Sequence, residues 1–439
     1  MSIEFTKVKK FLGNMNMFHE QVDMEKAYQH FIDDMNQGLN GEESSLQMIP
    51  TFIESNNEIP VNKKVIVLDA GGTNFRIALI HFDEEKKVVI DHFKKYPMPG
   101  SKGYLSFDQF FETIAEAVDD IIDKSDKIGF CFSYPTEILP DKDGRLIKWA
   151  KEVQAPEVEG KLIGQNLLKK IRKRGFNNKI DIVILNDTVA TLLTGKAAFP
   201  ERNYDGYLGY ILGTGLNSCY SESNELIHKL DSIHLDGSHR QIINIESGTF
   251  AVTERGKIDK VLDSKTADPG SFFLEKMTSG AYFGALVSEV LYEAEKSDLF
   301  SVDFNEELIK AGALSTKDVN EFLQNPFQKN NVLSEICFKY DNSDREILYY
   351  LIDAMLERAA KLIAINMAGI ILKSDMGHSA VRPMCLTVDG TTFYAYHKFQ
   401  YRVEKYLNNF LTGERKRYFD IVQVEDAPLI GAAIAALTN

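Results

Sequence analysis

The stretch at residues 65–80, VIVLDAGGTNFRIALI, decides the fold class of this chain. An apolar strand delivers Asp69 into a glycine turn, and a second apolar strand leaves it. Gly71 and Gly72 can adopt positive φ and let the backbone approach a ligand, and successive N–H groups at such a turn form an anion-binding nest. The polar residues that follow the turn are Thr73, Asn74 and Arg76. Paired glycines also mark ordinary two-residue hairpins. The flanking polar residues nevertheless favour a strand pair bent around a phosphate, with Asp69 placed to hold a cation through water.

A second stretch, residues 207–222, YLGYILGTGLNSCYSE, repeats this layout. It has an apolar strand, a glycine-flanked hydroxyl at Gly213, Thr214 and Gly215, and an outgoing strand that carries Asn217. Two turns of the same design, far apart in the chain, indicate two related lobes that each give one turn to a single nucleotide. This arrangement resembles the phosphate clamp of the actin-like ATPase superfamily. The resemblance implies an α/β, two-lobed actin-like ATPase (ribonuclease H-like) fold, with a small domain, a large domain and a cleft between them.

Chain length and charge limit the number of domains and the kinds of partner that we expect. With 439 residues the chain is too long for one small core, so we expect two domains. The balance of 50 basic and 64 acidic side chains gives a net charge of −14. Nucleic acid and anionic membrane surfaces are therefore not expected as main partners, because both require a basic footprint. The sequence leaves the oligomeric state open.

Cysteine usage and the N-terminus point to a reduced compartment. The four cysteines are scattered, without a CxxC pair or histidines at metal spacing, so neither a disulfide framework nor zinc is expected: Cys131, Cys219, Cys337 and Cys385. The N-terminus lacks the pattern of a signal peptide. The longest apolar helix candidate, residues 359–372, is too short to span a bilayer. We therefore expect a cytoplasmic protein.

The order of predicted elements alternates strands and helices, which indicates a mostly parallel sheet. Apolar residues at helical spacing predict a helix over residues 24–39. Further helices are predicted at 107–122, 164–174, 271–296, 306–311, 316–323, 344–372 and 428–437, and strands at 127–133, 181–185 and 384–388. We expect a small domain of residues 64–188 plus 427–439 and a large domain of residues 1–63 plus 189–426. The chain would cross between them near Asp187 and Asp426.

Asp187 lies at a position where we expect a catalytic residue. It follows the predicted strand at 181–185 within the motif NDTVAT. Ligands of parallel α/β sheets bind beyond the carboxyl ends of the strands, so Asp187 would project into a cleft. Aspartate is also a frequent helix N-cap, and that structural role is the alternative. The two phosphate turns shift the balance toward a general base.

At this point the chain resembles the hexokinase family. The motifs that carry the resemblance are LDAGGTNFR, FSYPTEI, IKWAK, LNDTVAT, LGTGLNSCY, NIESGTF, DPGSFFLEKMTSGAYFG, VDGTTFY and IGAAIAAL, in this order. The resemblance covers the chain from about residue 31 to the C-terminus, whereas residues 1–23 carry no matching motif. The resemblance implies an ATP- and Mg²⁺-dependent kinase that transfers the γ-phosphoryl group to the 6-hydroxyl of a hexose. Glucose is the first expectation, with fructose and mannose as alternatives.

The resemblance also implies a role for each matching residue. Asp187 would be the catalytic base that accepts the proton of the 6-hydroxyl. The residues implied in hexose binding are Ser133, Lys151, Asn186, Asp187, Glu246 and Glu275. Those implied in nucleotide binding are Asp69, Gly71, Gly72, Thr73, Asn74, Arg76, Gly213, Thr214 and Gly215, with Asp389, Gly390 and Thr391 on the adenosine side. Asp69 would also hold Mg²⁺, through water.

Structural alternatives exist for several of these residues. Arg76 could neutralise developing charge on the phosphate or form a structural salt bridge. Lys151 and Glu275 would be surface charges in most proteins. Glu246 lies among isoleucines in INIESG, which predicts a half-buried carboxylate.

Four positions on the sugar side depart from the family pattern: Ala150, Ser247, Asp268 and Phe272. The family usually has threonine, tryptophan, asparagine and glutamine there. The chain also has Asp426, Ala427 and Pro428 where a Gly–Ser–Gly run is usual. These changes leave the phosphate clamp and the base intact but touch the sugar rim, so the preferred hexose stays open.

Two other functions use the same fold. An actin-like or chaperone-type ATPase would use the clamp to drive a conformational change, but it needs no polyol site. A non-catalytic sugar sensor would keep the fold without the chemistry, and the presence of Asp187, Asp69 and both turns argues against it.

Overall fold

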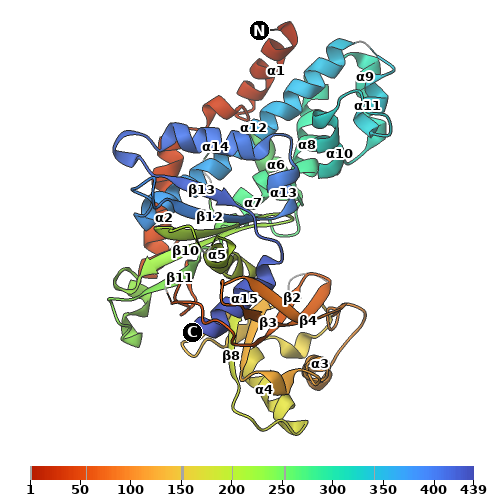
Figure 1. The fold of residues 1–439 in the computed structure, drawn as a ribbon. Helices are drawn as coiled ribbons and strands as arrows, with labels where there is room; N and C mark the ends of the chain where they lie inside the picture. The colour runs from red at the N-terminus through yellow and green to blue at the C-terminus, as the bar shows by residue number, and fades with distance from the viewer. Residues whose placement is uncertain (1, 56, 150–152, 200, 252–253, 341) are drawn as a thin grey trace.

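Two β-sheets, each covered by helices, form two lobes stacked one above the other in the computed structural model (Figure 1). The structure describes residues 2–439 except 56, 150–152, 200, 252–253 and 341. The fold class expected from the two glycine turns is confirmed, since each turn belongs to a different sheet.

The small-lobe sheet has the strand order β4-β3-β2-β5-β8. Its strands are β2 (Val65–Gly71), β3 (Asn74–Phe82), β4 (Val88–Pro97), β5 (Lys127–Phe132) and β8 (Asp181–Leu185), with β6 (Thr136–Ile138) and β7 (Gly144–Leu146) as a separate hairpin. β2 pairs antiparallel with β3, and β2, β5 and β8 run parallel. Nearly every residue of β2 and β5 is buried, as expected for parallel strands covered on both faces. The helices α3 (Phe107–Ala117) and α4 (Ile163–Lys173) pack together in this lobe.

The large-lobe sheet has the strand order β1-β11-β10-β9-β12-β13. Its strands are β1 (Ile49–Pro50), β9 (Gly206–Leu212), β10 (Leu216–Ser223), β11 (Arg240–Asn244), β12 (Met384–Asp389) and β13 (Phe419–Val422). β9 and β10 form an antiparallel hairpin, whereas β9, β12 and β13 run parallel. The second predicted turn therefore connects two central strands of this sheet.

The remaining helices cover the large-lobe sheet and extend away from it at the top of Figure 1. They are α1 (Ile3–Asn14), α2 (Met24–Asn40), α6 (Lys257–Lys265), α7 (Phe273–Thr278), α8 (Phe283–Lys296), α9 (Val302–Ala311), α10 (Thr316–Gln324), α11 (Val332–Cys337), α12 (Asn342–Ser374), α13 (Thr391–Ala395) and α14 (Phe399–Phe410). α12 is buried along most of its 33 residues because α1, α2 and α14 pack around it. Across the described residues, no helix is both long enough and apolar enough to cross a membrane.

Two helices join the lobes. α5 (Asp187–Ala198) follows β8 of the small lobe and packs on β9, and α15 (Ala427–Thr438) packs on α5, β5 and β2. A Cβ at Gly431 would lie 2.0 Å from the carbonyl oxygen of Ala190, and one at Gly129 would lie 2.0 Å from that of Ala432. The small residues of these segments therefore allow α15 to pack closely on both α5 and β5.

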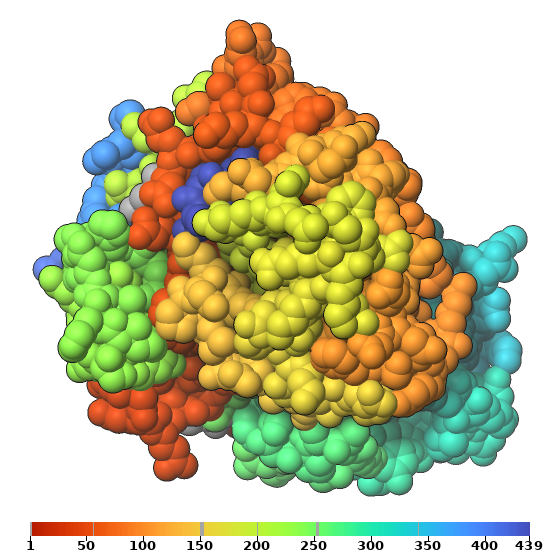
Figure 2. Space-filling view, turned by 90° about the horizontal axis from the view of Figure 1, so that it is seen from below, coloured from red at the N-terminus to blue at the C-terminus, as the bar shows by residue number. Residues whose placement is uncertain are grey.

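The segment after β1 meets the end of α15. The Asn57 amide donates to the Thr438 carbonyl at 2.8 Å, and the Asn439 amide oxygen accepts from the Glu54 backbone at 2.8 Å. Figure 2 shows this end of the chain (dark blue) between the red-orange segment and the small lobe. Glu54 and Asn57, which the predicted domain division assigns to the large domain, therefore contact the end of a segment that it assigns to the small one.

Most predicted elements are observed within a few residues, but two helices differ. The helix predicted at 107–122 ends at Ala117, and a 3₁₀ turn at Ile122–Lys124 follows the point where Asp119 pairs with Arg174. The helix predicted at 271–296 is two helices, α7 and α8, interrupted at residues 279–282. The interruption arises because backbone N–H groups there donate to the second glycine turn.

Candidate active site

The first glycine turn connects β2 and β3. Gly71 pairs with Asn74, so Gly72 and Thr73 form a two-residue hairpin turn, and Gly72 has a φ of 57°. The Gly72 carbonyl accepts from the Tyr134 hydroxyl at 3.2 Å, and the Thr73 carbonyl accepts from the Met98 backbone at 2.9 Å. The turn thus has hairpin geometry, but both of its carbonyls are fixed by residues outside the hairpin, and Thr73 is exposed.

Asp69 and Arg76 form an ion pair beneath this turn. Arg76 Nε lies 2.6 Å from Asp69 Oδ2, and Arg76 Nη1 lies 2.9 Å from Asp426 Oδ1. Asp69 is only 4% exposed, and burial raises the pKa of its carboxyl although Arg76 opposes this. Of the two roles considered for Arg76, the structure shows the salt bridge, which ties the first turn to the start of α15.

The other carboxylate oxygen of Asp69 faces the turn. A Cβ placed on Gly71 would lie 3.8 Å from Asp69 Oδ1 and 3.6 Å from Ser133 Oγ. Asp69, Gly71 and Ser133 therefore meet at one place at the carboxyl ends of β2 and β5. The described residues contain no group of three or more metal-ligating side chains. A single carboxylate of this kind fits an ion such as Mg²⁺ that retains most of its waters.

The second glycine turn connects β9 and β10 and is braced by three backbone and hydroxyl donors. The Gly213 carbonyl accepts from the Gly280 backbone and from the Thr392 hydroxyl, each at 2.8 Å. The Thr214 carbonyl accepts from the Ala281 backbone at 3.1 Å. Thr214 itself is exposed, so its hydroxyl and N–H group stay accessible.

The predicted adenosine-side turn, at Asp389, Gly390 and Thr391, lies against this second turn. Gly390 has a φ of 111°, and a Cβ there would lie 2.3 Å from the Leu212 carbonyl oxygen. The three predicted residues thus join the end of β12 to the turn that follows β9. Only glycine suits this backbone conformation and this close approach.

Sequence reasoning missed the residues that brace the second turn. Thr316 Oγ1 donates to the Gly280 carbonyl at 2.7 Å and accepts from the Gly284 backbone at 2.8 Å. Thr392 adds the hydroxyl contact described above. The available signal was the pattern of small and hydroxyl residues in SGAYFG and DGTT, which is too common to identify a partner by itself.

Asp187 begins α5 at the junction of the lobes. The N-cap of α5 is Asn186, whose side chain accepts from the Thr188 backbone at 2.9 Å. The alternative interpretation of Asp187 as the N-cap is therefore wrong, and the capping role of Asn186 was not predicted. A negative charge in the first helical turn is favourable because it faces the positive end of the helix dipole.

The negative charge of Asp187 affects the pKa of one group in each lobe. Burial is the main cause that raises the pKa of the Cys131 thiol in β5 and of the Glu246 carboxyl beyond β11. The negative charge of Asp187 raises both pKa values further. Asp187 directly follows the small-lobe strand β8 and Asn186, and the carbonyl of the next residue, Thr188, accepts from the Cys219 thiol of β10 in the large lobe at 3.1 Å.

Glu246 is held by two amides. The side chains of Asn217 and Asn244 both donate to Glu246 Oε1, at 3.0 and 2.8 Å, and the Glu246 backbone donates to Asn217 Oδ1 at 3.1 Å. The backbone of Glu246 has a φ of 59°, which is uncommon for a residue with a side chain. Within the described residues, Glu246 Oε2 accepts no hydrogen bond. This oxygen is available to a ligand, and Asn217 is a positioning residue that the site prediction did not include.

Glu275 lies beside the second turn and is half-buried, so it is not an exposed surface charge. Its Oε2 accepts from the Leu216 backbone at 2.8 Å, and a Cβ on Gly215 would lie 2.8 Å from the same oxygen. Burial, with the charges of Glu246 and Asp268 added, raises the pKa of Glu275 to about 7. Glu275, a predicted hexose-binding residue, is therefore in direct contact with the predicted phosphate turn.

The remaining predicted residues are placed as follows. Ser133 continues β5, and its backbone donates to the Ala70 carbonyl at 3.1 Å. Ser247 is fully buried, and Phe272 begins α7 with a φ of 53°. Lys151 and Ala150 lie outside the described residues. The structure thus places Asp69 and Ser133 beside the first turn, and Glu275 and Gly390 beside the second.

Comparisons with known proteins agree with this arrangement. Two family models, both described as hexokinase, match residues 7–197 and 207–438. Hexokinase-2 of Homo sapiens is 29% identical over 98% of this chain, and hexokinase-2 of Equus caballus is 30% identical over 91%. The matches cover 47% and 45% of those two relatives, so the chain spans about half their length.

Solved hexokinase structures share the whole fold. A Schistosoma mansoni hexokinase complexed with glucose matches with a TM-score of 0.76 and 25% identity, over 99% of both chains. Another hexokinase crystal structure matches with a TM-score of 0.79 and 20% identity, over the same fractions. With both halves matched by family models and both lobes matched in space, this chain belongs to the hexokinase family.

Proposed function

We propose that this protein is an ATP-dependent hexose kinase that transfers the γ-phosphoryl group to the 6-hydroxyl of a hexose, with glucose as the first candidate. The observation that carries the proposal is the position of Asp187, which begins α5 just after the last small-lobe strand, while the Thr188 carbonyl beside it accepts from the Cys219 thiol of the large-lobe sheet at 3.1 Å. The glucose complex of the Schistosoma mansoni relative supports glucose as the acceptor.

Asp187 would accept the proton of the 6-hydroxyl as that oxygen approaches the γ-phosphate. A carboxylate with an ordinary pKa is a weak base, but phosphoryl transfer passes through a loose transition state. Positioning and charge stabilisation therefore supply most of the rate enhancement. The fixed start of α5, secured by the Asn186 cap, supplies that positioning.

The hexose would be held by carboxylates that accept from its hydroxyls. Glu246 Oε2 is available, and Glu275 lies beside the second turn. Ser133, Asn186 and Lys151 complete the proposed set from the small lobe and the junction. A site built from directed polar groups rejects analogues that lack a hydroxyl, since its own groups would then stay unpaired.

The nucleotide phosphates would be cradled by backbone N–H groups at residues 71–74 and 214–215, with residues 389–391 toward the adenosine. Asp69 would hold Mg²⁺ through water, and the ion would neutralise phosphate charge when bound. Arg76 keeps Asp69 in place through the observed ion pair.

We also propose that residues 64–188 plus 427–439 and residues 1–63 plus 189–426 behave as two units that close over the sugar. Closure would exclude water that could otherwise hydrolyse ATP. The crossing points at Asp187 and Asp426 flank the helices α5 and α15. The four cysteines are free and buried, which is consistent with the predicted cytoplasmic location.

The test is a coupled assay with Mg·ATP over glucose, fructose, mannose and glucosamine. We expect Asp187→Asn to lower kcat by orders of magnitude while glucose still binds, as followed by intrinsic fluorescence or calorimetry. Substantial turnover by Asp187→Asn would refute its assignment as the base. ATP hydrolysis that does not depend on sugar would favour the ATPase, and glucose binding without phosphorylation by the unmodified protein would favour the sensor.

A further inference from the structure

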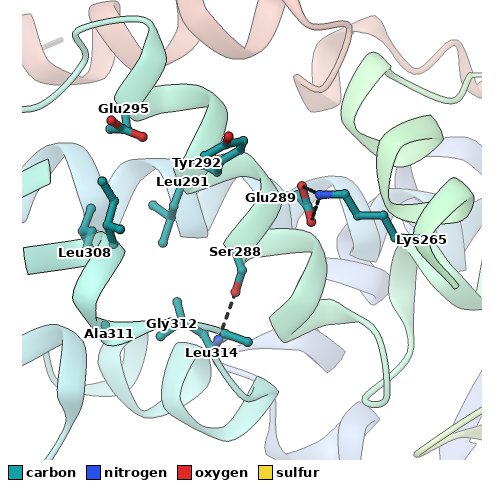
Figure 3. Close-up of a pocket in the computed structure, with 12 residues that line it drawn as sticks. Lys265, Ser288, Glu289, Leu291, Tyr292, Glu295, Leu308, Ala311, Gly312 and Leu314 are labelled. Carbon is teal, nitrogen blue, oxygen red and sulfur yellow. Dashed lines mark hydrogen bonds and ion pairs between the residues drawn. The ribbon is translucent and has the colours of Figure 1, made fainter. Parts of the chain in front are cut away.

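A cavity of about 400 Å³ lies in the large lobe between α8, α9 and the end of α6 (Figure 3). It contains none of the residues assigned above to hexose or nucleotide. Its volume is within the range of small-molecule sites in proteins. Half of its lining is apolar: Leu291, Leu308, Ile309, Ala311, Ala313 and Leu314.

The charges of the lining leave one carboxylate without a counter-charge. Lys265 Nζ contacts both carboxylate oxygens of Glu289, at 2.7 and 2.8 Å, so these two charges neutralise each other. Glu295 has no hydrogen bond or ion pair to any described residue. Figure 3 shows it near Leu291 and Leu308, on the side of the cavity away from the Lys265–Glu289 pair.

Neighbouring cations do not compensate Glu295. Lys296 pairs with Glu293 at 2.8 Å and lies over the ring of Tyr292, 4.0 Å from its centroid. Lys310 pairs with Glu307 at 2.8 Å. The cavity thus combines an apolar surface with a net negative charge at one end, which complements a compact molecule with an apolar body and one cationic group.

Hydrogen bonds connect the wall of the cavity to the residues that hold the second glycine turn. Ser288 Oγ in α8 accepts from the Leu314 backbone at 3.0 Å. Two residues further on, Thr316 donates to the Gly280 carbonyl, and the Gly280 backbone donates to the Gly213 carbonyl. A Cβ on Gly284 would lie 2.4 Å from the Thr316 backbone nitrogen, so α8 and this segment are in direct contact.

We propose that this cavity is a second ligand site that binds a small amphipathic amine, and that its occupancy changes the affinity of the nucleotide site. The ammonium group pairs with Glu295, and the apolar body packs against Leu291 and Leu308. A ligand that displaces residues 312–314 shifts Thr316 and, through Gly280, the turn at residues 213–215. Coupling of this kind is reciprocal, so nucleotide binding also changes the affinity of the amine.

The experiment compares three probes that share one apolar body: 4-phenylbutylamine, 4-phenylbutanol and 4-phenylbutyrate. Calorimetry on the full chain should show the amine binding about fivefold more tightly than the alcohol, as one half-buried charge pair of about 1 kcal/mol would give. The acid should bind more weakly still. Equal affinities for the three probes, or no saturable binding of the amine, would overturn the proposal.

Two variants locate the site. Glu295→Gln should remove the preference for the amine while the alcohol binds as before, and Leu308→Trp should abolish binding of both by filling the cavity. Glu306→Gln, which removes a carboxylate of α9 outside the cavity, is the matched control and should change nothing. Amine binding that persists in Glu295→Gln and Leu308→Trp would place the ligand elsewhere.

Coupling is measured separately, as the Kd of Mg·ADP with and without saturating 4-phenylbutylamine. We expect a change of at least threefold in the unmodified protein that disappears in Leu308→Trp. Binding of the amine with an unchanged Kd for Mg·ADP would overturn the coupling. The coupling rests on the proposed nucleotide site, whereas the amine titration does not, so a protein that binds the amine but not Mg·ADP would refute the nucleotide site and the coupling and leave the amine site standing.

Discussion

The two glycine turns have similar sequences, but different interactions hold them. The first is a two-residue hairpin fixed from below by the ion pairs of Arg76 with Asp69 and Asp426. The second is fixed by hydrogen bonds from Gly280, Ala281 and Thr392 and by the close approach of Gly390. The comparison shows that two turns of similar sequence are held differently: ion pairs support the first in addition to the hydrogen bonds on its two carbonyls, whereas hydrogen bonds and close backbone packing hold the second.

The largest effect is expected where the second turn depends on close contact. Gly390→Ala places a Cβ 2.3 Å from a backbone oxygen at a φ of 111°, and neither the contact nor the conformation can be relieved by a side-chain movement. We expect a loss of more than about 4 kcal/mol in the free energy of unfolding, measured by urea denaturation. Gly72→Ala in the first turn is the control. No atom lies within 4 Å of its Cβ, so only the cost of positive φ, about 1 kcal/mol, should appear. Equal losses in the two variants would contradict the distinction between the turns.

Breaking the ion pair should mainly affect the first turn. Arg76→Met leaves the buried carboxylate of Asp69 without its partner, and we expect unfolding to become easier by about 3 kcal/mol at pH 7.5. The pKa of Asp69 is already raised by burial and should rise further, so the loss should shrink as the pH falls and the carboxyl is protonated. Adding Asp69→Asn to Arg76→Met should recover part of the stability. A loss that does not change with pH would show that the pair is not the cause.

Glu275 gives the second turn a dependence on pH near neutrality. Since its pKa is raised to about 7 in the folded protein, the native state binds more protons than the unfolded state between pH 4.5 and 7. Stability from this group therefore falls as the pH rises through this window, by up to about 3 kcal/mol. Glu275→Gln should be more stable than the unmodified protein at pH 8 but not at pH 5.

The same ionisation of Glu275 should lower the KM for the hexose as the pH rises through 7, because the proposed role of this carboxylate is to accept hydrogen bonds from sugar hydroxyls. Identical pH profiles of unfolding for the two proteins would exclude this role.

The smallest effect is expected from a single hydroxyl. Thr392→Val keeps the shape of the side chain but removes the donor to the Gly213 carbonyl, which retains the Gly280 contact. We expect a loss of about 1 kcal/mol and a rise of a few-fold in the KM for ATP with an unchanged KM for the hexose. A changed KM for the hexose alone would place Thr392 outside the nucleotide side.

The sequence was sufficient to predict both turns, because Gly71–Gly72 and Gly213–Thr214–Gly215 each interrupt two apolar strand patterns with residues that permit a tight turn. It also predicted the order of strands and helices that places the turns in different sheets. Family resemblance then assigned the hexose carboxylates, and the structure places Glu275 against the second turn and Glu246 against Asn217 of the strand that leaves it.

What sequence reasoning could not predict depends on long-range contacts. The hydrogen bond from the Gly280 backbone to the Gly213 carbonyl joins residues that are far apart in the chain, and no local sequence pattern predicts it. The break between α7 and α8 has the same cause, since a helical pattern alone predicts one continuous helix. The choice between Asn186 and Asp187 as N-cap was also undetermined, because both residue types cap helices well.

The central claim is that the two turns hold one triphosphate and direct it at an acceptor held by Asp187. A crystal structure with glucose and a non-hydrolysable ATP analogue tests it most directly. We predict phosphate oxygens within hydrogen-bond distance of backbone N–H groups at both residues 71–74 and 214–215, and the glucose 6-hydroxyl within reach of the Asp187 carboxylate. Nucleotide and glucose bound at separate places, with neither turn in contact with phosphate, would contradict the claim.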